Sequence, residues 1–167
     1  MIEALAAALL LGAISTMFDV AAAELALQGR PAYLLARTLA ISFYIGGIVG
    51  ARARQITTGV VSGLFPAALA VAIYFGLTPM IGTAALALAW VGFWAAFCLL
   101  DAMLGEGISP SASLVLGLAA AVISGAAFQL IASGWVEESP KEPNLLRALV
   151  LWTATFLPGF VALCWRR

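Results

Sequence analysis

Residues 38–50 read TLAISFYIGGIVG, and this stretch decides how the chain folds. Its small residues Thr38, Ser42, Gly46 and Gly50 recur every four positions, so on a helix they form one stripe. In a bilayer such a stripe lets a second helix approach closely, because lipid tails supply no hydrophobic force that would drive helix packing. The stretch therefore predicts a tightly packed transmembrane helix.

The composition extends this prediction to the whole chain. Of its 167 residues 64% are hydrophobic and 10% are charged, and histidine is absent. Several apolar runs approach the length of about 20 residues that a helix needs to cross a bilayer. Eight basic and eight acidic residues give a net charge of zero, which provides no basic face for nucleic acid. We therefore expect an all-α polytopic protein that forms a single transmembrane domain.

Glycine, proline and polar residues divide the chain into six predicted spans. The spans cover residues 2–27, 32–50, 57–77, 80–104, 111–133 and 145–165. A turn at Thr78-Pro79 separates the third span from the fourth, and a polar connection at 137–144 precedes the sixth. Pro66 and Pro158 lie inside spans, where each removes a backbone hydrogen bond. We interpret both prolines as helix breaks that shape a solute site or act as hinges, with a simple packing kink as the alternative.

The small-residue stripe has a counterpart later in the chain. Gly117, Ala121 and Gly125 are also spaced by four and follow the first stripe at an offset of 79 residues. We therefore predict two copies of a three-span unit, at about 1–77 and about 80–167. Because three spans are an odd number, the second copy must insert upside down, which is the inverted repeat of many secondary transporters.

Charged residues inside the spans are the first candidates for binding a solute or an ion, since such residues are costly in a membrane and usually paired. Asp19 and Glu24 belong to the first span, and Arg37 lies at a similar depth in the second. Asp19, with Arg37, is expected either to bind a proton or a zwitterionic solute or to form a structural ion pair. Asp101 is the corresponding carboxylate of the second unit, and it either couples transport to protons or caps a helix end.

Polar and small residues complete the set of candidates. Ser42, Tyr44 and Gln129 are expected to be interior polar groups that need partners and can contact a solute. Trp90 and Trp94 share a helical face that either packs internally or faces lipid. The predicted helix-packing residues are Gly46, Gly50, Gly117 and Gly125.

No catalytic constellation is present in the sequence. It has no HExxH, GxSxG or P-loop motif, and no carboxylate cluster with the spacing of metal ligands. Cys98 and Cys164 lie in apolar segments without a CxxC pattern, so we interpret them as packing residues. We expect neither an enzyme nor a bound cofactor or metal.

The first two thirds of the chain contain charged residues, glycines and a proline in a definite order. An acidic residue and a glycine close the first span, an arginine begins the second span, and a glycine and an arginine end the second span. The residues are Glu24, Gly29, Arg37, Gly50, Arg52, Pro66 and Asp101. Over residues 1–104 this order is similar to that of the bacterial L-alanine exporter family. The chain departs from the Gly-x-x-Arg-like exit of that family, has a shorter loop after it, and has six predicted spans where the family has four. The resemblance implies export of a small neutral amino acid driven by an ion gradient.

Together these features predict a small secondary transporter or exporter of a small neutral or zwitterionic solute. A non-catalytic subunit of a larger membrane complex and a passive channel are the alternatives. Because so small a chain can hardly enclose a pathway alone, we expect a homodimer joined through a small-residue stripe, or a membrane-protein partner.

The positive charges favour one orientation in the membrane. Basic residues beside span ends favour the cytoplasmic side. They fall into two groups, with Arg52, Arg54, Arg166 and Arg167 on the side of the termini, and Arg30, Arg37, Lys141 and Arg147 on the other. We expect a bacterial inner-membrane protein with both termini in the cytoplasm.

Overall fold

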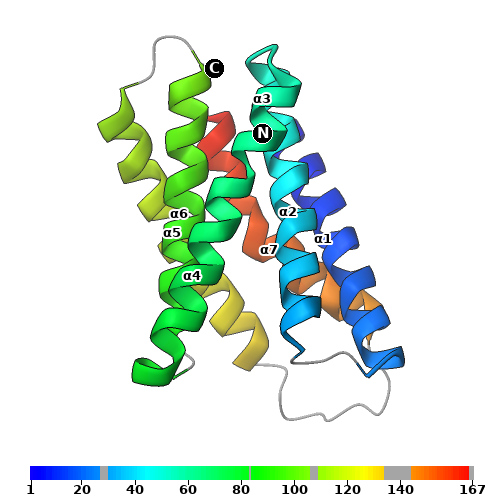
Figure 1. Ribbon diagram of the computed structural model, residues 1–167. Coiled ribbons are helices and arrows are strands. Elements are labelled where there is room, and N and C mark those ends of the chain that lie inside the picture. Colours follow the sequence, from blue (N-terminus) through cyan, green and yellow to red (C-terminus); the bar gives the residue numbers. More distant parts are fainter. Residues whose placement is uncertain (27–29, 83, 106–108, 134–143, 166–167) are drawn as a thin grey trace.

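The computed structural model describes residues 1–26, 30–82, 84–105, 109–133 and 144–165, and its regular elements are helices (Figure 1). They are α1 (Ile2–Glu24), α2 (Pro31–Arg52), α3 (Ile56–Ser62), α4 (Leu64–Ile81), α5 (Ala84–Leu104), α6 (Pro110–Ser133) and α7 (Leu145–Cys164). In this described part, six helical stretches are long and apolar enough to cross a membrane, with α3 and α4 together forming one of them. The all-helical prediction is therefore confirmed, and the six stretches fit a multi-pass membrane protein.

The predicted span limits hold to within a few residues except at one turn. The chain does not turn at Thr78-Pro79, because α4 continues through both residues to Ile81. The turn comes at Gly82, whose φ of 61° is a left-handed conformation that glycine adopts without steric cost. Gly29, Lys141, Arg166, Arg167 and the polar connection at 137–143 lie outside the described residues.

The helices form a closed ring. In order, α1 packs against α7, α7 against α6, α6 against α5, α5 against α4, α4 against α2, and α2 against α1. Helix α5 also contacts α2 and α7 across the ring, and α3 packs on α2. The first residues of α1 and the last of α7 lie at the same end of the bundle, which we call the terminal end (Figure 1).

Near the terminal end, α2 and α3 are held together by glycines. A Cβ atom at Gly46 would lie 2.5 Å from the carbonyl oxygen of Gly59, and one at Gly63 would lie 2.9 Å from that of Ser42. Gly50 lies equally close to Gly59, so the two backbones touch along two helical turns. This is the close approach predicted for the stripe. Its partner, however, is the next helix of the same chain, so Gly46 and Gly50 are not available to join two copies.

The helix break between α3 and α4 follows from the proline at position 66. Pro66 is the third residue of α4 and has no N–H with which to bond the carbonyl of Ser62, the last residue of α3. Gly63 separates α3 from α4 but keeps a right-handed helical backbone, and α4 runs on from it toward the opposite end of the bundle (Figure 1). By contrast, α7 continues through Pro158 without interruption.

Aromatic side chains fill the centre of the bundle. Trp94, Phe97, Phe156 and Phe160 are all fully buried. Gly159 makes room for the Trp94 ring, because a Cβ atom at this position would overlap the ring. The face that carries Trp94 therefore packs internally rather than toward lipid.

Two glycines at equivalent positions of the predicted repeat allow a matched test of the α2–α3 contact. Gly46→Ala places a methyl group against the backbone of α3, and we expect overpacking to lower the free energy of unfolding by about 1–3 kcal/mol. Gly125→Ala meets nothing within 4 Å, so the higher helix propensity of alanine should leave stability unchanged or raised. Unfolding of the purified variants in mild detergent, followed by circular dichroism, measures both. Equal effects of the two substitutions would contradict the described contact.

Candidate functional site

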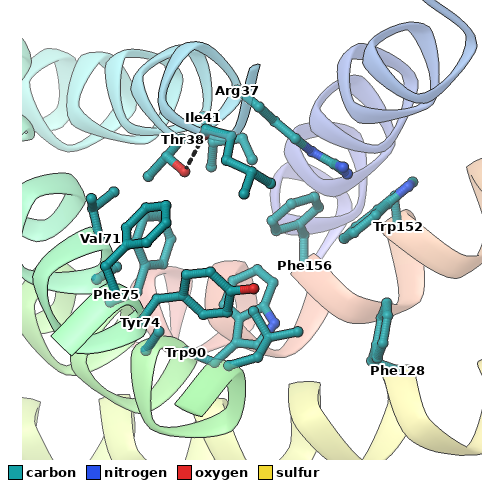
Figure 2. A pocket seen from close by; sticks show the side chains of 15 residues that line it. Arg37, Thr38, Ile41, Val71, Tyr74, Phe75, Trp90, Phe128, Trp152 and Phe156 are labelled. Atoms are coloured by element: carbon teal, nitrogen blue, oxygen red, sulfur yellow. Dashed lines mark hydrogen bonds between the residues drawn. The ribbon is translucent and has the colours of Figure 1, made fainter. Parts of the chain in front are cut away.

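A cavity of about 280 Å³ lies between α2, α4, α5, α6 and α7 (Figure 2). Its walls are largely apolar, and aromatic rings dominate them. The aromatic residues that line it are Tyr74, Phe75, Trp90, Phe93, Phe128, Trp152 and Phe156. Arg37 and Thr38 provide polar groups at the α2 wall.

The cavity is located where α2 and α4 separate. From α2 it is lined by residues of the first half, such as Leu34 and Ile41, and from α4 by residues of its middle, such as Ala70 and Tyr74. The glycine contact instead joins the second half of α2 to α3 and Gly63, near the terminal end. The contact of α2 with α3 and the cavity between α2 and α4 thus follow one another along the same pair of spans.

An ion pair connects α1 with α2 beside this cavity. The Arg37 Nη1 atom donates a hydrogen bond to Asp19 Oδ1 at 2.8 Å. The Tyr33 hydroxyl donates to the same oxygen at 3.5 Å, and the Trp152 indole N–H donates to Asp19 Oδ2. The Arg37 guanidinium also lies over the Trp152 ring, with Cζ 4.0 Å from the ring centroid. Trp152 thus contacts both members of the pair and connects them to α7.

The two charges are not equally covered. The Arg37 side chain is 14% exposed and that of Asp19 is 34% exposed. The Arg37 Nη2 atom is buried and makes no hydrogen bond to the described residues. Arg37 therefore contributes its charge to the cavity wall, whereas the accessible N–H and O–H donors of the lining belong to Trp90 and Tyr74 (Figure 2).

The structure places several of the predicted site residues elsewhere. Glu24 is exposed at the last position of α1. Tyr44 is partly buried, and its hydroxyl donates to the carbonyl of Ala7 at 3.2 Å, so it connects helices rather than lining the cavity. Ser42 is fully buried, and its hydroxyl has no hydrogen-bond partner among the described residues. Gln129 is exposed on the outer face of α6, so the expectation that it is an interior group is wrong.

Asp101 is buried but remote from the ion pair. It lies near the end of α5 beside Cys98 and Ser113, in a crevice at the terminal end that has no room for a water molecule. Asp19, in contrast, lies in the last third of α1, toward the opposite end. The fold therefore does not bring the two predicted carboxylates into one site. The predicted packing residue Gly117 contacts α5, whereas a Cβ atom at Gly125 would meet nothing within 4 Å.

The aromatic lining was not predicted from the sequence, which identified only the Trp90 face. Trp152 and Phe156 are four residues apart on α7 and so share one face, and this spacing is a signal that sequence reading can detect. Tyr74 and Phe128 carry no such signal, because their place in the wall depends on how α4 and α6 pack.

Among the residues described, no three His, Cys, Asp or Glu side chains are grouped closely enough to hold a metal ion. No protein-family model, curated protein or solved structure matches this chain. The arrangement of the site is therefore the basis for the proposals that follow.

A double-mutant cycle tests the ion pair. Asp19→Asn and Arg37→Gln each leave one charge without its partner in an apolar region, so each should destabilise the protein. The double variant removes both charges and should be more stable than the sum of the single effects predicts, with a coupling free energy of about 0.5–3 kcal/mol. Detergent unfolding monitored by circular dichroism gives the four values. Strict additivity would show that the two residues do not interact.

Proposed function

We propose that this chain is a small secondary transporter or exporter, and that its solute binds in the cavity beside Arg37. The observation that carries the proposal is a charged, hydrogen-bonded group at the wall of an otherwise apolar cavity. Small-molecule sites usually have this form, with apolar walls and a few placed polar groups. Ionisable residues within membrane spans are also functional candidates by default. The solute class remains the one expected from the sequence, a small neutral or zwitterionic molecule.

The helix pairing supports an inverted repeat. In the predicted repeat, α1 corresponds to α5 and α4 corresponds to α7. A pair of symmetric copies should then show the α1–α7 contact and its equivalent, the α5–α4 contact, and both are present. The α2–α4 and α6–α7 contacts correspond in the same way. The remaining pair differs, since α6 packs extensively on α5 whereas α2 touches α1 slightly. We propose that alternating access exchanges these two packing states.

We further propose a bacterial inner-membrane location with both termini in the cytoplasm, because arginines of the α2–α3 turn lie at the terminal end with them. The cavity would then lie nearer the other side of the membrane. A homodimer would need an interface other than Gly46 and Gly50, which α3 covers. The exporter resemblance of residues 1–104 agrees with this proposal but is independent of the cavity.

Flux through the purified chain in proteoliposomes tests the proposal. Labelled L-phenylalanine and labelled phenylpropionamide serve as zwitterionic and uncharged probes of one size. We expect at least one probe to cross faster than in protein-free liposomes. Ala70→Phe should abolish this excess because Ala70 lines the cavity, whereas Ala119→Phe, on the exposed face of α6, should preserve it.

Two results would contradict the transporter proposal. The first is identical flux of both probes with and without protein. The second is a chain that isolates in a stoichiometric complex with another membrane protein and moves a probe only within that complex, which would identify it as a subunit.

A further inference from the structure

The charges around the cavity are balanced before any solute binds. Arg37 is the charged residue of the described lining, and Asp19 neutralises it at 2.8 Å. A solute with a net charge would therefore add an uncompensated charge to an apolar, aromatic surrounding, which is strongly unfavourable. A solute without net charge avoids this cost.

The hydrogen-bonding groups of the wall discriminate further. Asp19 Oδ1 accepts from Arg37 and Tyr33, and Oδ2 accepts from Trp152, so the carboxylate already has partners on both oxygens. The Thr38 hydroxyl donates to the carbonyl of Leu34 at 2.8 Å. Arg37 Nη2 makes no hydrogen bond to the described residues, but it is buried from the cavity as well. The donors that remain at the wall are the Tyr74 hydroxyl and the Trp90 indole N–H (Figure 2). The wall thus provides a donor for an acceptor oxygen, and no free carboxylate for an ammonium group.

The volume and the ring geometry define the rest of the solute. An engineered protein cavity of about 150 Å³ accommodates benzene. The cavity of about 280 Å³ is almost twice as large, so it has room for one aromatic ring and a short polar chain. Trp90 lies edge-to-face with Phe156 at 5.6 Å between ring centroids, and Phe156 stacks on Trp152 at 5.9 Å. Aromatic ligands pack on such walls in the same offset and edge-to-face geometries.

We infer that the solute of this cavity is an uncharged aromatic molecule that carries a hydrogen-bond acceptor, such as an aryl-alkyl amide, with its oxygen on the Tyr74 hydroxyl or the Trp90 indole N–H. This inference rests on the proposed function, because it names the class of solute for the same site. It also assigns Asp19 a specific role. By neutralising Arg37, Asp19 makes the cavity select against anions.

Binding to the full chain in lipid nanodiscs tests the inference with four probes that share one phenyl-propyl body. They are phenylpropionamide, phenylpropionate, phenylpropylammonium and L-phenylalanine, which are uncharged, anionic, cationic and zwitterionic at neutral pH. Isothermal titration calorimetry, with empty nanodiscs as the blank for partition into lipid, gives each affinity. We expect the amide to bind about tenfold or more tightly than each of the others.

Asp19→Asn supplies the sharper test, because it unbalances Arg37 without touching the cavity lining. In this variant phenylpropionate should overtake the amide, since the anion now provides the missing negative charge. A merely structural role of Asp19 would weaken all four probes together and leave their order unchanged. Ala70→Phe should remove amide binding, and Ala119→Phe should not.

Three results would overturn the inference. One is tightest binding of a charged probe or of L-phenylalanine by the unmodified chain. Another is an order of affinities that Asp19→Asn leaves unchanged. The third is a co-purified lipid acyl chain that occupies the cavity and is displaced by none of the probes. These failures differ from failure of the transporter proposal, since amide binding without protein-dependent flux would leave the inference standing and remove the transporter.

Discussion

The backbone contact between α2 and α3 is the constraint on which the rest of the bundle depends. Glycines hold α2 and α3 together near the terminal end, so the chain can move away from α2 only after α3 has ended. Pro66 marks the end of that contact, because it has no N–H for the carbonyl of Ser62, the last residue of α3, and α4 begins just before it. The cavity lies where the helices then separate. A packing requirement at one end of the bundle thus creates space at the other.

The ion pair turns that space into a polar recognition site. Asp19 alone or Arg37 alone would be a costly charge within an apolar helix. Together they form a neutral unit, and Trp152 stabilises both, the carboxylate through its indole N–H and the guanidinium through its ring. The guanidinium can therefore remain at the cavity wall although one of its nitrogens is buried without a hydrogen bond to the described residues. A change of charge at this unit would alter which solutes the cavity accepts.

Much of this arrangement follows from the sequence, and the rest requires the packed structure. Apolar length predicts the six spans, and the rarity of charges identifies Asp19 and Arg37 as a pair. The small-residue stripe predicts that a backbone approaches at Gly46, but it does not tell whether that backbone belongs to the same chain or to a second copy. Helical spacing does not tell which face of α6 is covered by other helices, and for this reason the sequence predicts an interior position for Gln129, which is exposed. The aromatic wall joins residues of four helices beside α2, and their meeting depends on how those helices pack.

A crystal structure of the chain grown with the para-brominated analogue of phenylpropionamide would test the central claim most directly. Anomalous scattering locates the bromine without reference to the surrounding density. We predict a single bromine peak inside the cavity, with the amide oxygen within hydrogen-bond distance of the Tyr74 hydroxyl or the Trp90 indole N–H and the Asp19–Arg37 pair unbroken. A bromine outside the cavity, or an ion pair that opens to admit the amide, would contradict the account.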